Sequence, residues 1–465
     1  MRGKSIRASV FYFIGNIFDK AIAFITVPIF TRLLSTADYG ITSTYLSWVS
    51  VLSVVITLSL GESARNGVVE YSNDKDSFMS SIISLGTISA LVITGILYIG
   101  SYLFDFGFTP TVVLLCCAHS YAVSIITAVQ WQYVMEVKYV SRTLLQSIPN
   151  LLIVIISIIL IRHFPNEKYL GRIIPNVFIL FIITLAYLLF YFYRGKCFVS
   201  MKYWKYALNF SLPVIFHTIS SVILAQADRT MILSLRNSSE AGIYGLAYQF
   251  GSLPQVIVTT CENIWVPWLT KMMHEKKYQL INQMVEHYIL LVAVLCAEIM
   301  LISPEILKIM TVEDYYDAIF LISPIIAATF FLFLATISVD VEYFEKNTRS
   351  VAANSAIVAL INIVLNFLFI PKYGAIAATF TTLSSYFMLF LLHYFTVKSI
   401  RKELLKPNMY FVPVMIVMIV MVITELLAAQ WWFRWGMGVA LLIVLGVYGY
   451  KQYTKYHANC QKTGI

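Results

Sequence analysis

Residues 206–250 read YALNFSLPVIFHTISSVILAQADRTMILSLRNSSEAGIYGLAYQF, and residues 9–48 read SVFYFIGNIFDKAIAFITVPIFTRLLSTADYGITSTYLSW. Each stretch is an apolar span with a charged pair inside it, then a short polar turn, then the start of a second apolar span. The turns match as DYGI at 38–41 and EAGI at 240–243. An offset of about 200 residues predicts that one half of the chain repeats the other half.

The composition is that of a membrane protein. Of the 465 residues, 59% are hydrophobic and 12% are charged, and the mean hydropathy is +0.78. Soluble domains carry about 25% charged residues. A helix that crosses the hydrocarbon layer needs about 20 apolar residues, and such runs recur along the chain. Because the runs are continuous and do not alternate with polar residues, they predict helices and exclude the strands of a membrane barrel.

The apolar runs predict an all-α integral membrane protein with about fourteen transmembrane helices. The predicted spans lie near 10–31, 42–61, 79–104, 111–135, 145–162, 173–193, 208–232, 242–265, 282–303, 317–341, 352–370, 375–397, 409–429 and 434–450. They predict two pseudo-symmetric six-helix lobes, over 1–195 and 206–400, followed by a helix pair at 407–452 and a cytoplasmic tail at 453–465. Since six is even, the two lobes form a parallel repeat, and a cavity between them is expected.

The basic residues predict the topology. The net charge of +9 would suggest nucleic-acid binding in a soluble protein, but basic residues collect in the cytoplasmic loops of membrane proteins. With the N-terminus inside, about 23 of the 33 basic residues fall in cytoplasmic segments. The loop 162–172 is an exception, with three basic residues on the outer side. We therefore expect both termini in the cytoplasm, and no nucleic-acid partner.

The sequence carries no sign of an enzyme. None of the six cysteines forms a C-x-x-C pair, and most lie in apolar runs, which indicates buried small side chains and neither a metal site nor a disulfide framework. The chain has no G-x-S-x-G, H-E-x-x-H or phosphate-binding Gly-Lys-Ser/Thr loop. It predicts a protein without catalytic residues, cofactor or metal, for which a gradient of H⁺ or Na⁺ is the plausible energy source.

Charged and polar residues inside the spans are the candidate functional groups, because a charge at mid-membrane costs about 2.5–3.5 kcal/mol on insertion scales. Asn16, Asp19 and Lys20 share one helical face by their spacing. In the matching span of the second half, His217 and Asp228 lie along one stripe, with Arg229 beside it. Glu62, Arg65 and Asn66 form a similar face, and the other acids lie within or at the ends of later spans; these are Glu262, Glu298, Asp340, Glu342 and Glu425.

Two interpretations of these charges are open. Asp19 with Lys20, and Asp228 with Arg229, are either structural pairs that neutralise each other between helices, or residues that line a water-filled cavity for a charged substrate and a coupling ion. Their recurrence in corresponding spans of both halves favours the cavity.

Other polar residues have plainer explanations. His119 is expected to be a packing histidine, and Asn354, Asn362 and Asn366 to bond neighbouring helices. Tryptophans near predicted span ends suit an interfacial belt; they are Trp131, Trp265, Trp268, Trp431 and Trp432. Trp131 is also placed to stack on a sugar ring.

Short motifs follow one another in a specific order; they are RLLS to DYG at 32–40, QADR at 226–229, EAGIY at 240–244, Ala247-Tyr248, Asn362, Asn366, Ile370-Pro371, Gly374, Ala377-Ala378 and Thr379. In these motifs, over residues 1 to about 400, the chain resembles the polysaccharide-biosynthesis flippases of the Wzx type, in a superfamily that includes the multidrug-extruding MATE transporters and the lipid II flippase MurJ.

The resemblance implies a flippase of the bacterial cytoplasmic membrane that moves an undecaprenyl-diphosphate-linked oligosaccharide outward by alternating access, with H⁺ or Na⁺ coupling. Other partners it implies are the bilayer, a glycan polymerase and chain-length proteins. A diphosphate needs cations, so the candidate substrate-binding residues are Lys20, Arg65, Arg229, Asn16 and His217. The candidate ion-coupling residues are Asp19, Asp228, Glu62, Glu262 and Asp340.

The last two predicted helices depart from the twelve spans usual in the Wzx group and are closer in number to MurJ, which suggests a lateral groove for the polyprenyl tail. Two other functions stay open. One is a MATE-type multidrug exporter of the same fold. The other is a membrane glycan polymerase or ligase, which would be expected to carry a sizeable external loop with catalytic residues.

Overall fold

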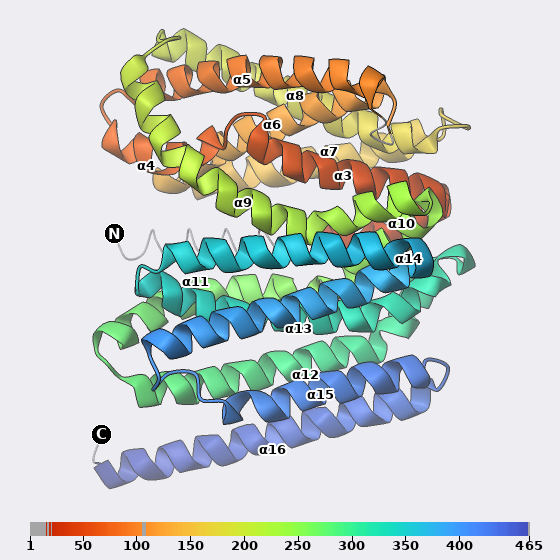
Figure 1. The fold of residues 1–465 in the computed structure, drawn as a ribbon, viewed down its shortest axis with the longest axis vertical. Coiled ribbons are helices and arrows are strands. Elements are labelled where there is room, and N and C mark those ends of the chain that lie inside the picture. Colours follow the sequence, from red (N-terminus) through yellow and green to blue (C-terminus); the bar gives the residue numbers. More distant parts are fainter. Residues whose placement is uncertain (1–14, 16–17, 20, 105–107, 464–465) are drawn as a thin grey trace. The chain divides into compact units, whose positions relative to one another are not determined.

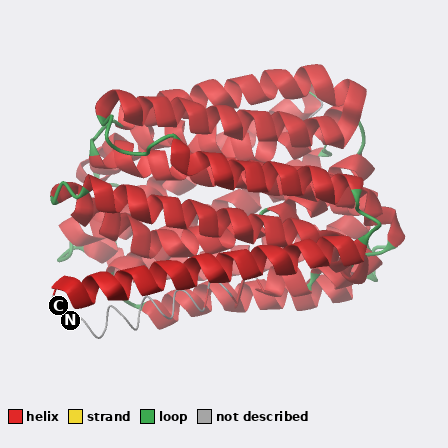
Figure 2. Cartoon of the chain, turned by 90° about the horizontal axis from the view of Figure 1, so that it is seen from below, coloured by secondary structure: helices red, strands yellow, loops and turns green. Residues whose placement is uncertain are grey.

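The computed structural model describes residues 15, 18–19, 21–104 and 108–463; at 213–214, 216–217, 260, 263, 452–453 and 455–463 it describes the backbone alone. In this part of the chain every regular element is a helix, and the rest is turn and loop (Figure 2). The predicted all-α architecture is confirmed.

The chain forms two compact units, and each is described by itself. The first unit comprises residues 1–245 and 355–378. Its helices are α2 (Val27–Leu33), α3 (Thr36–Val55), α4 (Leu60–Glu70), α5 (Lys75–Leu103), α6 (Pro110–Met135), α7 (Tyr139–Ile161), α8 (Lys168–Gly195), α9 (Met201–Leu235) and the start of α10 (Ser238–Gly251) (Figure 1).

The second unit comprises residues 246–354 and 379–465. Its helices are α11 (Leu253–His274), α12 (Tyr278–Met310), the 3₁₀ turn η1 (Glu313–Ala318), α13 (Ile319–Phe344), α15 (Asn408–Leu426) and α16 (Trp431–Thr463). Helix α14 (Thr348–Ile400) contributes to both units. These units group residues by contact, whereas the predicted boundaries at 1–195, 206–400, 407–452 and 453–465 follow the sequence repeat, and that division stays a prediction.

Nine helices in the described part are long and apolar enough to cross a membrane, or ten if the bent pair α3–α4 is one span. Helix α14 has 53 residues, or about 80 Å at 1.5 Å per residue, and non-helical dihedrals at Gly374 divide it. It therefore supplies both predicted spans 352–370 and 375–397. Helix α9 corresponds to 208–232, and the first predicted span lies mostly outside the described residues.

Two spans predicted as single helices, 42–61 and 242–265, are each broken in two. In the first half α3 and α4 meet at a 46° bend, where Leu58 and Ser59 have left-handed backbone angles. In the second half α10 ends at Gly251 and α11 starts with Pro254 in its first turn. Left-handed residues other than glycine cost of order 1–3 kcal/mol, so the surrounding packing must hold the backbone at this bend. With the turns at 38–41 and 240–243 aligned, Ser252 between α10 and α11 corresponds to residue 50 inside α3, so the two breaks lie at different places of the repeat.

In both copies of the repeat, the matched turn is the N-terminal start of a helix, α3 in the first copy and α10 in the second. Ser35 Oγ accepts from the Asp38 amide at 3.1 Å, and the Asp38 carboxylate accepts from the Ser35 amide at 3.3 Å, which is a capping box. In the second copy Asn237 Oδ1 accepts from the Glu240 amide at 2.8 Å. The matching acids are therefore part of matching N-terminal caps, which explains why the turns are alike.

The two copies of this turn pack against each other inside the first unit. A Cβ atom on Gly40 would overlap the carbonyl oxygen of Ser238, and one on Gly242 would overlap that of Thr36. The contact is reciprocal, as expected for two related segments that meet across a local two-fold axis. Glycine is required at both positions because no side chain fits between the backbones.

The division of α14 is held by the second copy of the turn. Gly374 has φ +61° and ψ −142°, and a Cβ there would overlap the Glu240 carboxylate. Glu240 also accepts from the Ala375 amide at 3.2 Å and pairs with Arg236 at 3.0 Å. The acid thus caps the arm of α14 that follows Gly374, and the positive φ explains why the residue is glycine.

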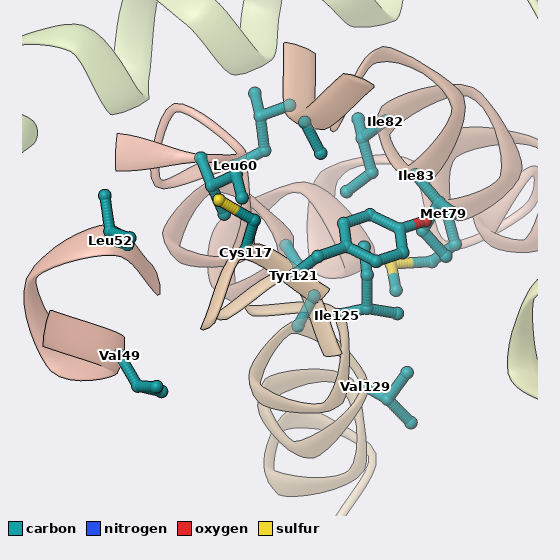
Figure 3. Packing of buried hydrophobic residues seen from close by; sticks show 14 of the residues in the cluster. Val49, Leu52, Leu60, Met79, Ile82, Ile83, Cys117, Tyr121, Ile125 and Val129 are labelled. Carbon is teal, nitrogen blue, oxygen red and sulfur yellow. The ribbon is translucent and has the colours of Figure 1, made fainter. Parts of the chain in front are cut away.

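Apolar side chains of α3, α4, α5 and α6 fill the interior of the first unit. Figure 3 shows Leu52, Leu60 and Ile82 around Tyr121 and Ile125 of α6, all of them buried. Lipid is as apolar as these side chains, so close packing and interhelical hydrogen bonds hold such helices together. Two serines of α6 supply those bonds by donating to carbonyls of α3.

We expect Gly40→Ala and Gly242→Ala each to lower the free energy of unfolding by about 1–3 kcal/mol, because the added methyl group forces two backbones apart. Thermal unfolding of the purified protein measures the effect. Gly95→Ala is the matched control, since a methyl group added at this position of α5 would have no neighbouring atom within 4 Å. Equal melting temperatures for Gly40→Ala and Gly95→Ala would contradict the close contact.

A charge cluster outside the spans makes stability depend on pH. Glu136, after the end of α6, pairs with Lys75 at 2.6 Å and Lys138 at 2.5 Å, and accepts from Gln132 at 3.0 Å. Burial raises the pKa of the Glu136 carboxyl, but the hydrogen bonds from these three residues outweigh it and lower the pKa from 4.5 to about 2. A carboxyl with a lowered pKa stabilises the fold above its unfolded pKa, near 4.5, and this contribution is lost as the pH falls through about 2.

We therefore expect Glu136→Gln to lower the melting temperature at pH 7 and to have a shrinking effect as the pH is lowered from about 5 to 2. Glu275→Gln is the control, because Glu275 forms a similar pair with Lys277 at an exposed position, where ion pairs contribute about 0–1 kcal/mol. A pH-independent difference between Glu136→Gln and the parent protein would refute the assignment.

Candidate functional site

The predicted site residues that the structure describes fall in both units. Asp19, Glu62, Arg65, Asp228 and Arg229 belong to the first unit. Glu262 and Asp340 belong to the second unit. Asn16, Lys20 and the side chain of His217 lie outside the described residues.

Asp228 is the centre of a buried polar network within the first unit. Its side chain is 1% exposed, and it accepts hydrogen bonds from the Tyr244 hydroxyl at 2.5 Å and from Asn366 Nδ2 at 2.6 Å. Asn366 Nδ2 also donates to Asn362 Oδ1 at 3.2 Å. Helices α9, α10 and α14 therefore meet at one carboxylate.

The asparagines predicted as interhelical bonds thus converge on a predicted ion-coupling acid. Asn362 and Asn366 are separated by four residues, so they occupy one face of α14, and both are fully buried. The Asp228 carboxylate is thus held by two neutral donors, the Tyr244 hydroxyl and the Asn366 amide nitrogen. The sequence singled out Asp228, Asn362 and Asn366 but not their meeting or the Tyr244 donor, because the α9–α14 pairing is not encoded in local spacing.

Arg229 is directed to α3. It donates to Ser47 Oγ at 3.1 Å and to Gln226 Oε1, and Ser47 Oγ in turn donates to Gln226 Oε1 at 3.0 Å. The Thr44 hydroxyl donates to the Arg229 carbonyl oxygen at 3.3 Å. The guanidinium is half-buried, so it is fixed in position while one part of it stays accessible.

Glu62 lies just after the bend between α3 and α4. It accepts from Trp131 Nε1 of α6 at 3.3 Å, and the Arg65 guanidinium lies 4.9 Å from the centre of the Trp131 ring. A cavity of about 100 Å³ adjoins Glu62; its lining is Ser53, Val54, Thr57, Ser59, Gly61, Glu62, Val123, Ser124, Thr127 and Thr218. Six of the ten lining residues are serine or threonine, and the cavity has one acid, with the exposed Arg65 one turn further along α4.

Asp19 is held more loosely. Its Oδ1 accepts from Asn150 Nδ2 of α7 at 3.3 Å, and the side chain is half-buried. Its predicted partner Lys20 lies outside the described residues, so the pairing of these two stays a prediction.

The second unit has a corresponding acid and tryptophan. Trp265 Nε1 of α11 donates to Asp340 Oδ2 of α13 at 3.1 Å. Glu262 is close enough to Asp340 for the two carboxylates to interact electrostatically. Beside them is an aromatic cavity of about 390 Å³, lined by Cys261, Ile264, Trp265, Trp268, Met284, His287, Tyr288 and Leu291.

The two clusters match across the repeat but differ in charge. Glu62 lies 24 residues after Asp38, and Glu262 lies 22 residues after Glu240, so the two acids have similar places after the matched turns. Each unit thus joins an indole N–H to a carboxylate on a neighbouring helix. The interfacial-belt prediction is wrong for Trp265, which is buried, whereas Trp431 and Trp432 are exposed as a belt requires.

Other polar residues within the spans have structural partners. His119 Nδ1 is hydrogen-bonded to the Tyr45 hydroxyl at 3.2 Å, and both side chains are buried, in agreement with the predicted packing role. Glu342 pairs with His393 at 2.7 Å between α13 and α14. The fully buried Arg434 of α16 pairs with Glu305 of α12. The described residues contain no group of three or more His, Cys, Asp or Glu side chains that could hold a metal ion, and no disulfide.

Solved structures with a similar fold are membrane transporters. The lipid II flippase MurJ in an inward closed conformation superposes with a TM-score of 0.72 at 17% identity, covering 97% of this chain and all of MurJ. An inward-facing multidrug resistance MATE transporter superposes with 0.57 at 11% identity over 82% of this chain and 96% of its own. The MATE transporter VcmN of Vibrio cholerae gives 0.52 at 16% identity over 88% and 98%. These likenesses establish the fold.

Two proteins of Haemophilus influenzae are similar in sequence. Lsg locus putative protein 1 is 23% identical over 364 residues, which cover 74% of this chain and 86% of that protein. An uncharacterized membrane protein is 22% identical over 272 residues, which cover 57% of this chain and 65% of its own. The sequence profile of the family described as polysaccharide biosynthesis protein matches residues 5–273, more than half of the chain. This chain is therefore a member of the polysaccharide biosynthesis protein family.

Proposed function

We propose that the protein is a flippase that translocates an undecaprenyl-diphosphate-linked oligosaccharide across the bacterial cytoplasmic membrane, for synthesis of O antigen, capsule or exopolysaccharide. One observation carries the proposal: a member of a polysaccharide biosynthesis family has the fold of a protein named as a lipid II flippase. We propose alternating access as the mechanism, with both termini in the cytoplasm. A glycan polymerase and chain-length proteins are the partners expected to use the product.

The anionic head group requires cations that are held in position and accessible. Arg65 is exposed and stacks over Trp131, and Arg229 is oriented by Ser47 and Gln226. An arginine guanidinium binds phosphate oxygens in a bidentate manner. Trp131 adds an aromatic face suited to a sugar ring. Lys20, Asn16 and His217 remain candidates for the same role.

Ion coupling is proposed for Asp228, with Asp19, Glu62, Glu262 and Asp340 as further candidates. Asp228 is buried, and the neutral side chains of Tyr244 and Asn366 orient it. A buried carboxylate held by oxygen-bearing and amide side chains can take up H⁺ or Na⁺. Binding there would change the contact among α9, α10 and α14, and that is how an ion gradient would act on the fold.

A multidrug exporter is the alternative that one observation favours. Glu262 and Asp340 place two carboxylates beside the aromatic cavity of the second unit, an arrangement that suits an apolar cation. Drug susceptibility of a deletion strain separates the two functions, because loss of an exporter sensitises cells and loss of a flippase removes surface glycan. A polymerase or ligase would instead lengthen glycan chains in vitro.

We expect Arg65→Ala and Arg229→Ala each to reduce surface-polysaccharide export about tenfold or more when they replace the parent gene in a deletion strain, since a charged hydrogen bond contributes about 1.5–3 kcal/mol. Lys20→Ala tests the third candidate in the same assay. Arg349→Ala, at an exposed position near the start of α14, is the control. Normal export by both Arg65→Ala and Arg229→Ala, at parental protein levels, would overturn this binding site.

We expect Asp228→Asn to abolish the response of translocation to an imposed Na⁺ or proton gradient in proteoliposomes, because the isosteric amide cannot bind a cation or release a proton. Asp76→Asn is the control, since Asp76 pairs with Arg194 in the first turn of α5, away from this network. If gradient dependence persists in folded Asp228→Asn, the coupling ion binds elsewhere, and the next variants are Asp340→Asn and Glu62→Gln.

A further inference from the structure

The C-terminal helices α15 and α16 pack beside α12 within the second unit (Figure 1). Two hydrogen-bonded contacts join α16 to α12, because Arg434 pairs with Glu305 near one end of α16 and Tyr448 bonds to His287 at 3.0 Å further along it. Helices α15 and α16 are thus both packed against α12, and the surface of this three-helix group contains cavities.

An apolar slot of about 290 Å³ runs between these three helices. Each helix contributes residues at helical spacing: Leu290 and Val294 from α12, Val412, Pro413 and Ile416 from α15, and Leu441, Val444, Leu445 and Tyr448 from α16. Such spacing puts the contributions of each helix on one face. The slot is therefore continuous along the helices, as an acyl chain requires.

A second, polar cavity of about 260 Å³ adjoins one end of the slot. Its lining is Gln279, Asn282, Gln283, Glu286, Lys406, Asn408 and Met409. Glu286, Asn408 and Met409 line both spaces, so the polar cavity and the apolar slot are adjacent. The two cavities together are amphipathic. The polar cavity lies at the basic linker 398–406, and the apolar slot lies among α12, α15 and α16.

The linker is fixed in place over the polar cavity. Asn282 Nδ2 donates to the Glu403 carbonyl at 2.8 Å, and Asn282 Oδ1 accepts from the Leu405 amide at 2.8 Å. Lys398 Nζ donates to the Leu404 carbonyl at 2.6 Å. These bonds fix the backbone just before Lys406, whose exposed side chain lines the cavity.

The polar cavity presents one charge of each sign. Neither Glu286 nor Lys406 forms an ion pair with another side chain in the part of the chain that the structure describes. Lys406 is suited to a phosphate, and Glu286 to an ammonium group. An anionic lipid without an amine would bring its charge to the Glu286 carboxylate, and a quaternary ammonium has no N–H to donate to it.

We infer that this cavity pair binds a membrane phospholipid whose head group carries a phosphate and a primary amine, as in phosphatidylethanolamine. The phosphate contacts Lys406, the amine contacts Glu286, and one acyl chain occupies the slot among α12, α15 and α16. The lipid is a resident component that fills the wall between the C-terminal pair and α12. This inference does not depend on the substrate proposed for transport.

Native mass spectrometry of the full-length protein in mild detergent tests the inference, with phosphatidylethanolamine, phosphatidylglycerol and phosphatidylcholine of identical acyl chains. We expect one phosphatidylethanolamine to be retained about fivefold more tightly than either other lipid, the size of a single ion pair. Glu286→Gln should remove the preference over phosphatidylcholine, and Glu286→Lys should shift it to phosphatidylglycerol.

The apolar slot has its own matched test. Leu445→Trp fills it and should abolish retention of all three lipids, whereas Leu442→Trp, at an exposed position of the same helix outside the slot, should not. Equal melting temperatures verify that both variants fold. Equal retention of the three lipids, or retention unchanged by Leu445→Trp, would overturn the inference. So would displacement of phosphatidylethanolamine by an equimolar polyprenyl diphosphate, which would assign the slot to a substrate tail.

Discussion

Two helix N-termini meet at Gly40 and Gly242, and much of the first unit depends on that approach. Such an encounter is electrostatically unfavourable, because each N-terminus carries partial positive charge. Each turn brings its own compensating acid: the Asp38 carboxylate accepts from the Ser35 amide, and the Glu240 carboxylate accepts from Asn237 Nδ2. Glu240 serves a further helix start at Ala375. Glycine therefore permits the approach, and the acids stabilise it, which is why the repeat preserves both features.

Acids inside the spans have two kinds of partner. Asp19, Glu62 and Asp340 accept from neutral donors, namely Asn150, Trp131 and Trp265. Glu342 and Glu305 face ionisable partners instead, His393 and Arg434. A neutral donor orients a carboxylate and leaves its charge for a ligand, whereas a cationic partner cancels that charge. Acids with neutral donors suit ligand binding, and acids with ionisable partners suit the attachment of one helix to another. The charge of the partner therefore distinguishes acids that have similar positions in the spans.

The sequence predicts the helices well and their junctions poorly. Apolar run length and the matched DYGI and EAGI turns fix the all-α fold, the repeat and the division of α14 near Gly374, because these depend on local composition. The break after α3 escapes prediction, since neither Leu58 nor Ser59 is typical of left-handed backbone. The acids of the candidate site were recognised from the energetic cost of burying charge. Their donors Tyr244 and Trp131 were not, because which helices pack together is decided by tertiary structure.

Helix α14 belongs to both units and forms hydrogen bonds in each of them. Its residues 355–378 belong to the first unit, where Asn362 and Asn366 reach the Asp228 network, while residues on either side belong to the second. In the second unit Glu342 holds His393, and Asn354 donates to Thr396 at 3.2 Å, so both arms are attached there. A ligand can shift a conformational equilibrium only through groups whose contacts differ between states. Asp228 contacts α14 through Asn366, and Glu342 contacts it through His393, so each unit has an acid bonded to this helix.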